Sequence, residues 1–435
     1  MNNEIQTEKL GYKKIFVFWY PLALTWLMMA IETPYLTAII ARLPDPKFNL
    51  AAFGVAFSFA LIIEAPIIMI MSASTALVKD SGAFYKLRRF TYTLNFSITL
   101  ILLICLLPPI FNYIARNMIG LPPEVAHLTH VATMILLPWP AAIGFRRFYQ
   151  GILIRNNKTR LVAYGTVVRL STMSTTALVL YLLHVPGAWV GAGSLSMGVL
   201  GEAIATRWMC RLEVNRLKQE PKNSPTSLTY KIIIHFYYPL ALMTILTLGV
   251  QPLVVFFIGK SRFALESLAV LPVINALVFI FRSVGLSFTE VALALLGKDN
   301  RNYIPLRNFA LILGAISLAT FSLISFTPLA GIWFNKVSGL SPALTAFSLL
   351  PTQIITLLPV LTLYLSLQQA LLMNIKKTIA ITWATVIEVS VIIGSIQLAI
   401  YGFAAIGAVA ATSAFTIGRL CANLFLLPYQ RRATR

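Results

Sequence analysis

Six charged side chains lie deep inside long apolar stretches of the sequence. They are Glu32, Glu64, Arg169, Arg282, Glu290 and Glu388. A charge in the interior of a bilayer is costly, so it faces a water-filled cavity or an opposite charge. Carboxylates in such a place can bind protons or sodium ions, and arginines, which stay protonated, can bind anions. We therefore predict that these six residues form a substrate- and ion-binding site, with ion pairs that lock helices together as the alternative.

Two further charges, Glu202 and Arg419, lie in predicted outer helices, where structural ion pairs are the favoured interpretation. The sequence shows no nucleophile–His–acid set, no nucleotide-binding loop and no metal-ligand spacing. Its cysteines, Cys105, Cys210 and Cys421, are far apart in apolar stretches, as is typical of buried structural cysteines. We expect no enzymatic activity, no metal and no cofactor, with H⁺ or Na⁺ as a coupling ion.

The composition identifies the class of protein that must position these charges. Of the 435 residues, 58% are hydrophobic and only 11% are charged, whereas soluble domains carry about 25% charged residues. The sequence therefore predicts an all-α polytopic membrane protein. The net charge of +21 also fits nucleic-acid binding, but the basic residues lie in short loops between apolar stretches. This is the positive-inside pattern of membrane proteins, so we expect the lipid bilayer and no nucleic acid as partner.

Twelve stretches are long and apolar enough to cross a membrane, for which about 20 residues are needed. They cover 15–40, 51–78, 90–114, 125–150, 161–183, 188–210, 231–258, 265–296, 306–332, 342–372, 378–400 and 404–427. Several contain a proline, which in a helix bundle predicts a kink because neighbouring helices can satisfy the freed carbonyl groups. These prolines are Pro66, Pro138, Pro140, Pro272 and Pro359.

The loops between these stretches alternate in charge. One side of the predicted membrane carries 26 basic residues, and the other carries six. Those six are Arg42, Lys47, Arg116, Lys260, Arg262 and Lys336. Twelve helices with both termini in the cytoplasm fit this alternation without exception. We expect a monomeric multi-pass protein of the plasma (inner) membrane.

The two halves of the chain are related by an internal repeat. Trp19-Tyr20-Pro21-Leu22-Ala23-Leu24 recurs 218 residues later as Tyr237-Tyr238-Pro239-Leu240-Ala241-Leu242, and 150–171 matches 369–390 at an offset of 219. Six helices is an even number, so both copies enter the membrane in the same sense and a pseudo-two-fold axis runs along the membrane normal. We predict an N-lobe at 1–212, a cytoplasmic linker at 213–227 and a C-lobe at 228–435.

The repeat also relates the intramembrane charges, and it reverses their sign. Arg169 corresponds to Glu388, and Glu64 corresponds to Arg282. If these faces meet between the lobes, they form inter-lobe ion pairs that close one side of the protein and break in another state. Coincidence is the alternative interpretation.

Three features occur in order near the start of the chain: Pro21, then Glu32, then Leu50-Ala51-Ala52-Phe53-Gly54 at the start of the second helix. They carry a resemblance that covers the whole chain. This order resembles the multidrug/oligosaccharidyl-lipid/polysaccharide (MOP) exporter superfamily, with a MATE-like fold of two six-helix lobes. Within it, the sequence looks most similar to the progressive ankylosis protein family. That similarity lies in Tyr238-Pro239-Leu240-Ala241-Leu242 and Leu372-Met373-Asn374-Ile375-Lys376-Lys377-Thr378.

The resemblance implies a transporter. Ankylosis proteins are implicated in the export of pyrophosphate, nucleotides and organic acids, whereas the superfamily's multidrug exporters couple efflux of organic cations to sodium or protons. We expect a secondary active exporter of a small organic solute, with an organic anion or a pyrophosphate- or nucleotide-like solute favoured, working by alternating access and coupled to H⁺ or Na⁺. Multidrug efflux and flipping of a lipid-linked precursor are the alternatives.

Overall fold

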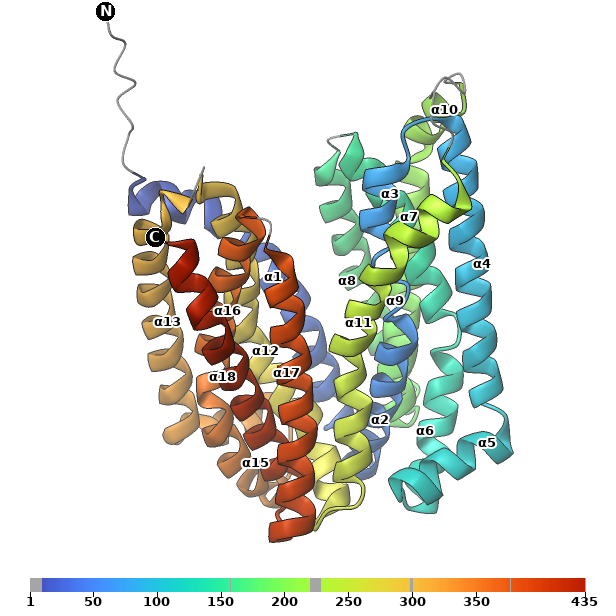
Figure 1. The fold of residues 1–435 in the computed structure, drawn as a ribbon. Helices are drawn as coiled ribbons and strands as arrows, with labels where there is room; N and C mark the ends of the chain where they lie inside the picture. Colours follow the sequence, from blue (N-terminus) through green and yellow to red (C-terminus); the bar gives the residue numbers. More distant parts are fainter. Residues whose placement is uncertain (1–9, 157, 220–227, 298–299, 376, 435) are drawn as a thin grey trace, which may run out of the picture.

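The chain folds into two groups of long helices that meet at one end and separate toward the other (Figure 1). The computed structural model describes residues 10–156, 158–219, 228–297, 300–375 and 377–434. The N-lobe contains α1 (Tyr12–Ile40), α2 (Pro46–Glu64), α3 (Ile70–Leu77), α4 (Ser81–Cys105), α5 (Pro108–Asn112), the π-helix η1 (Tyr113–Ile119), α6 (Pro123–Ile135), α7 (Trp139–Arg155), α8 (Thr159–Leu182) and α9 (Gly187–Met209), and α10 (Arg211–Gln219) follows. The C-lobe contains α11 (Tyr230–Ile258), α12 (Ala264–Leu295), α13 (Tyr303–Phe326), α14 (Leu329–Gly331), the π-helix η3 (Ile332–Val337), α15 (Pro342–Ile354), η4 (Ile355–Leu357), α16 (Leu358–Asn374), α17 (Thr378–Gln397), η5 (Leu398–Gly402) and α18 (Gly407–Ala433).

These helices account for the twelve predicted spans. Ten helices or helix stacks in the described residues are long and apolar enough to cross a membrane, and the bent pair of α4 with α5 and η1 adds an eleventh. The twelfth is α8, whose 24 residues extend over about 36 Å. Its two arginines, Arg160 and Arg169, make it less apolar than the others. The chain is therefore an all-α multi-pass membrane protein with two lobes of six spans.

Prolines break several spans, as the sequence predicts. A turn at 65–69 separates α2 from α3 beside Pro66, and Pro138 lies between α6 and α7. The predicted end of the third span at 114 is wrong. The helix stops at Cys105 and bends by 69° into the segment that runs to Ile119, because Pro108 and the proline after it supply no N–H donor.

The predicted linker also begins differently, because α10 extends as a helix to Gln219. Its apolar side is held against the N-lobe, where Val214 and Leu217 are buried. The remaining linker positions, 220–227, lie outside the described residues. The positive charges of α10 thus sit at the end of the N-lobe where the chain crosses to the second half.

Backbone turns repeat along with the sequence. A left-handed residue precedes both α2 and α12, at Asp45 and Phe263, and left-handed glycines follow the π-helices η1 and η3, at Gly120 and Gly339. The offsets of 218 and 219 residues are those of the sequence repeat. Because such backbone conformations are rare outside glycine, their recurrence at equivalent positions shows that the two halves share turn geometry as well as sequence.

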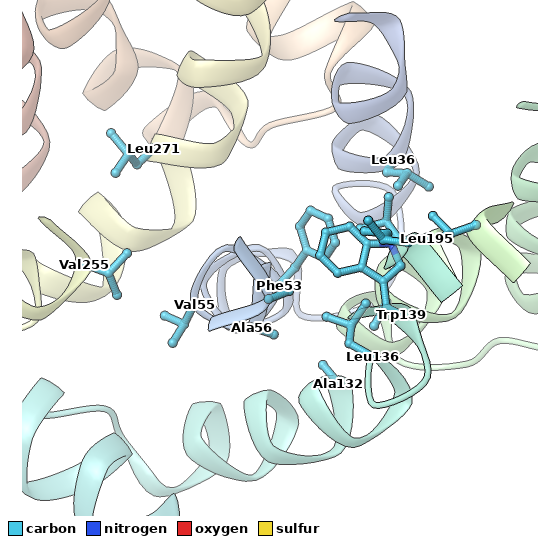
Figure 2. Packing of buried hydrophobic residues seen from close by; sticks show 14 of the residues in the cluster. Leu36, Phe53, Val55, Ala56, Ala132, Leu136, Trp139, Leu195, Val255 and Leu271 are labelled. Atoms are coloured by element: carbon cyan, nitrogen blue, oxygen red, sulfur yellow. The ribbon is translucent and has the colours of Figure 1, made fainter. Parts of the chain in front are cut away.

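The largest packing cluster joins α2 to α1, α7 and α9. Figure 2 shows Phe53 of α2 pointing toward Trp139, with Leu36 and Leu195 close by. A Cβ atom at Gly191 would lie 2.6 Å from the Phe53 ring, so only glycine lets α9 approach that ring. Small residues at helix contacts are typical of membrane bundles, where tight packing replaces the hydrophobic driving force.

The first helix of each half crosses to the opposite lobe (Figure 1). Near the start of α1, the Trp19 indole Nε1–H donates to Ser287 Oγ of α12 at 2.9 Å. Near the start of α11, the Tyr237 hydroxyl donates to the Pro66 carbonyl, and its ring meets Phe90 edge-on at 5.3 Å. Trp19 and Tyr237 are the first residues of the repeated motif. The repeat therefore encodes two equivalent anchors, each on the second span of the other lobe.

The lobes touch at the end of the molecule whose loops carry few basic residues, among them Arg42 and Lys47. The Arg42 guanidinium donates to the Lys336 and Val337 carbonyls at 2.7 and 2.8 Å, and Lys47 pairs with Glu266 at 2.7 Å. Further toward the middle of the molecule, α2 and α12 pack so closely that a Cβ at Gly54 would lie 2.6 Å from Pro272 Cγ. These contacts hold this end of the protein closed.

Replacing Arg42 by glutamine should loosen this end, because two charge-assisted hydrogen bonds between the lobes are lost. Such bonds contribute about 1.5–3 kcal/mol each at most, so maleimide labelling of a cysteine at the buried Val55 position should become about tenfold faster. The native cysteines are first replaced by alanine. Arg116→Gln, exposed at the same end, is the matched control. Equal labelling rates in the two variants would contradict this role.

Candidate ion and substrate sites within the membrane

Glu202 on α9 is the centre of a buried charge cluster in the N-lobe. It is 1% exposed, pairs with Arg146 of α7, and accepts a hydrogen bond from Gln150 Nε2 at 3.0 Å. Arg169 of α8 lies 4.0 Å from the same carboxylate. One carboxylate thus collects donors from two neighbouring helices, which compensates for its burial away from water.

Arg169 connects this cluster to α1, because its guanidinium also pairs with Glu32. Glu32 is 4% exposed, and its Oε1 atom is buried without a hydrogen-bond partner in the described part of the chain. One oxygen of Glu32 is therefore engaged and the other has spare capacity to bind a proton or a cation. Glu32 lies on α1, the helix that crosses from the N-lobe to the C-lobe.

Glu64 at the end of α2 completes the N-lobe set. It is 8% exposed, its Oε2 atom is buried without a partner among the described residues, and the strongest charge acting on it is Arg147. The cluster therefore contains three glutamates and three arginines, so its formal charges balance. An apolar surrounding favours a cluster whose formal charges sum to zero. The oxygens of Glu32 and Glu64 that have no hydrogen-bond partner can still bind a proton or a cation.

The C-lobe carries a related ion pair with the signs exchanged. Glu388 of α17 pairs with Arg419 of α18 at 2.8 Å, whereas in the N-lobe the arginine is on the first helix of the hairpin and the glutamate is on the second. Both hairpins pack through a glycine. A Cβ at Gly198 would lie 3.2 Å from the Arg169 carbonyl, and one at Gly418 would lie 3.0 Å from that of Glu388.

Arg282 of α12 lies within electrostatic reach of this C-lobe pair, with Arg419 as the stronger influence and Glu388 as the weaker. Its Nε atom is buried and has no hydrogen-bond partner in the described residues, and the same holds for Nε of Arg419. The C-lobe cluster therefore has two positive charges and one negative charge. It is the unbalanced counterpart of the N-lobe cluster.

Glu290, the last predicted site residue, belongs to neither cluster. It is exposed on α12 and accepts a hydrogen bond from the side chain of Trp26 on α1. It therefore marks the contact between α1 and α12, on the same side of the molecule as the Trp19 anchor.

The inter-lobe pair between Arg169 and Glu388, which the sequence predicts for one state of the protein, is not formed in this conformation. Arg169 pairs instead with Glu32 of α1 and lies 4.0 Å from Glu202 of α9, and Glu388 pairs with Arg419 of α18, the helix that packs on α17. Glu64 and Arg282 do not pair in this conformation either, since the charges acting on each come from its own lobe.

Arg146 and Arg147 are not among the predicted site residues, because they lie next to the basic loop that follows their helix and are typical of its positive charge. A signal was present, since Arg146 and Gln150 lie four residues apart in an apolar stretch and therefore share one face of a helix. The structure buries both side chains against Glu202.

Solved structures of transporters resemble this chain in fold. The chain is 16% identical to a MATE-family multidrug resistance transporter of the MOP superfamily in an inward-facing conformation, with a TM-score of 0.71 over 94% of this chain and 97% of the other. An outward-facing MATE structure gives 0.63 at 16% identity, over 99% and 98% of the two chains. The lipid II flippase MurJ in an inward closed conformation gives 0.69 at 16% identity, over 95% and 87%.

No family model matches the sequence. At these identities the structural likeness establishes the fold, which is the two-lobe, twelve-helix arrangement of MATE and other MOP-superfamily transporters. The likeness extends over nearly the whole chain, so both charge clusters lie within the shared fold.

Glu202→Gln should destabilise the protein by about 3 kcal/mol, because it leaves the buried Arg146 without its carboxylate. Glutamine has nearly the same shape and volume as glutamate, so the loss of stability results from the removed charge and not from a cavity. Thermal unfolding of the purified protein in detergent measures it. Glu124→Gln, an exposed acid at the start of α6, is the control and should unfold like the wild type. A wild-type midpoint for Glu202→Gln would show that Arg146 has enough other partners.

Proposed function

We propose that the protein is a secondary active transporter that exports a small organic solute by alternating access of its two lobes, coupled to H⁺ or Na⁺. The observation that carries this proposal is the pair of intramembrane charge clusters, one in each lobe, which retain unbonded carboxylate and guanidinium groups. A purely structural ion pair would use its polar atoms fully, because unused buried polar atoms are costly. The fold shared with transporters supports the same conclusion.

The conformation described here fits an inward-facing state of such a cycle. The inter-lobe contacts of Arg42 and Lys47 lie at the end with few basic residues, which the positive-inside pattern assigns to the outside. The start of α1 and the end of α18 lie at the opposite, separated end (Figure 1). Both termini are then cytoplasmic, in a monomer of the plasma (inner) membrane. The higher similarity to an inward-facing than to an outward-facing MATE structure agrees with this assignment.

An organic anion is the favoured substrate. Arg282 provides an unmatched positive charge, and the resemblance to ankylosis proteins adds pyrophosphate-like and nucleotide-like solutes to the candidates. Two alternatives follow from the structural neighbours, which include a multidrug resistance transporter and a lipid II flippase. A drug-like cation would bind to the N-lobe carboxylates that have an oxygen without a hydrogen-bond partner. A lipid-linked precursor would place its headgroup in the space between the lobes.

Metabolite profiling of medium and cells, with and without the gene, identifies solutes that depend on the protein. The hits are then tested for uptake into proteoliposomes with an imposed proton or sodium gradient. Gradient-dependent flux of a soluble solute supports the proposal. Scrambling of lipid-linked molecules without solute flux would favour the flippase alternative, and the absence of both would overturn the proposed activity.

Glu32→Gln should abolish gradient-driven flux and leave the protein folded, because the amide cannot exchange a proton while it still accepts a hydrogen bond from Arg169. Flux in proteoliposomes and the elution profile of the purified protein measure the two effects. Glu124→Gln is again the matched control. Unchanged coupled flux in Glu32→Gln would reduce Glu32 to a structural partner of Arg169.

A further inference from the structure

We propose that an anionic phospholipid binds through its phosphate group to the outer surface of the N-lobe where α4, α7 and α9 meet. The residues of this phosphate surface are Arg88, Tyr92, Tyr149, Arg207 and Arg211. It lies near the start of α4 and beside α10, at the separated end of the molecule (Figure 1), which the positive-inside pattern assigns to the cytoplasm. The inference goes beyond the proposed transport function, because it concerns the surrounding membrane and not the transported solute.

The first argument is that two arginines flank a pair of tyrosines. The hydroxyl groups of Tyr92 on α4 and Tyr149 on α7 lie 3.2 Å apart. The guanidinium carbon of Arg88 lies 6.0 Å from the centre of the Tyr92 ring, and that of Arg207 lies 5.1 Å from the centre of the Tyr149 ring. One tyrosine donates to the other, which leaves one O–H group free. The surface therefore combines a hydroxyl donor with two guanidinium groups, and such donors bind phosphate oxygens.

The second argument is that the arginines of this surface have no acidic partner. No carboxylate among the described residues forms an ion pair with Arg88, Arg207 or Arg211, and the acid nearest to them in the chain, Glu213, pairs with Arg216. A guanidinium group stacked on an aromatic ring keeps its charge and the N–H donors at its edge. The phosphate surface is therefore positive and complementary to an anion.

The third argument is that the surface faces lipid and not the cytosol. Trp208 and Ile204 on α9 and Phe96 on α4 are all more than half exposed. Ile204 and Phe96 lie on the membrane side of the arginines, and the Arg211 guanidinium carbon lies 4.9 Å from the centre of the Trp208 ring. Exposed aromatic and long cationic side chains of this kind meet at the level of the lipid headgroups. The anion at that level is the phosphate of a lipid whose acyl chains contact the apolar side chains.

The repeat provides a second instance of the same arrangement. At an offset of 220 residues, where the hairpin glycines of α9 and α18 align, Arg211 corresponds to Arg431 and Ile204 to Leu424. This face of α18 is hollowed into a groove of about 430 Å³, lined by Leu424, Leu427, Pro428, Arg431 and Arg432. The last span of each lobe thus carries arginine next to exposed apolar side chains at its cytoplasmic end. Basic pockets at this level of a membrane protein suit anionic headgroups.

Titration of phosphatidylglycerol into the purified full-length protein in a neutral detergent tests the phosphate surface, with bound lipid counted by native mass spectrometry. The wild type should bind phosphatidylglycerol in preference to phosphatidylcholine. Arg88→Gln and Arg207→Gln should each weaken phosphatidylglycerol binding about fivefold, because each removes one of the charges that attract the phosphate. Tyr92→Phe keeps the ring beside Arg88 and removes only a hydroxyl donor, and it should also weaken binding about fivefold. Unfolding midpoints without lipid check that the variants are folded.

Arg89→Gln is the matched control, because it removes the same charge one residue away from an exposed side chain outside the phosphate surface. It should keep the wild-type affinity within about twofold. Equal weakening by Arg88→Gln and Arg89→Gln would overturn the assignment, since the attraction would then come from the net charge of the protein. Equal binding of phosphatidylglycerol and phosphatidylcholine would overturn it too, as would displacement of the lipid by sodium phosphate but not by sodium chloride at equal ionic strength.

Discussion

The constraint on which this structure depends is that a charge in the membrane interior is costly unless an opposite charge or water meets it there. Glu202 meets it most fully, with Arg146, Gln150 and Arg169 around one carboxylate. This arrangement fixes the relative positions of α7, α8 and α9, because moving any of them would leave a buried charge uncompensated. The N-lobe is held by electrostatics as well as by packing, and Glu32 extends the same network to α1.

The duplicated halves keep one architecture and divide its chemistry. Turn geometry, the glycine contact in each hairpin and the aromatic anchors Trp19 and Tyr237 recur at equivalent positions. Two charged positions recur with opposite sign, since Arg169 corresponds to Glu388 and Glu64 corresponds to Arg282. A repeat of this kind permits specialisation, because a balanced cluster suits reversible binding of a coupling ion and an unbalanced cluster suits binding of a charged solute.

The sequence predicted the helices and the repeat well, because apolar length, proline positions and loop charge are local properties. It did not predict which charges meet. Arg169 and Glu388 are equivalent in sequence, yet pairing depends on which helices are neighbours, and α8 and α17 each lie against their own hairpin partner. Arg146 was missed for a related reason, since its burial against Glu202 is decided by the helix α9 that packs on it from 56 residues away.

The crossing of α1 has a consequence for how the protein is made. Ile15 is completely buried in a cluster that includes Phe288 and Leu371, and the bond between Trp19 and Ser287 spans 268 residues of chain. Because α1 is synthesised long before α12, it cannot reach these final neighbours until the second half of the chain has been synthesised and inserted. An N-terminal half made alone would carry an uncovered helix face, so biogenesis requires either a waiting partner for α1 or the second half of the same chain.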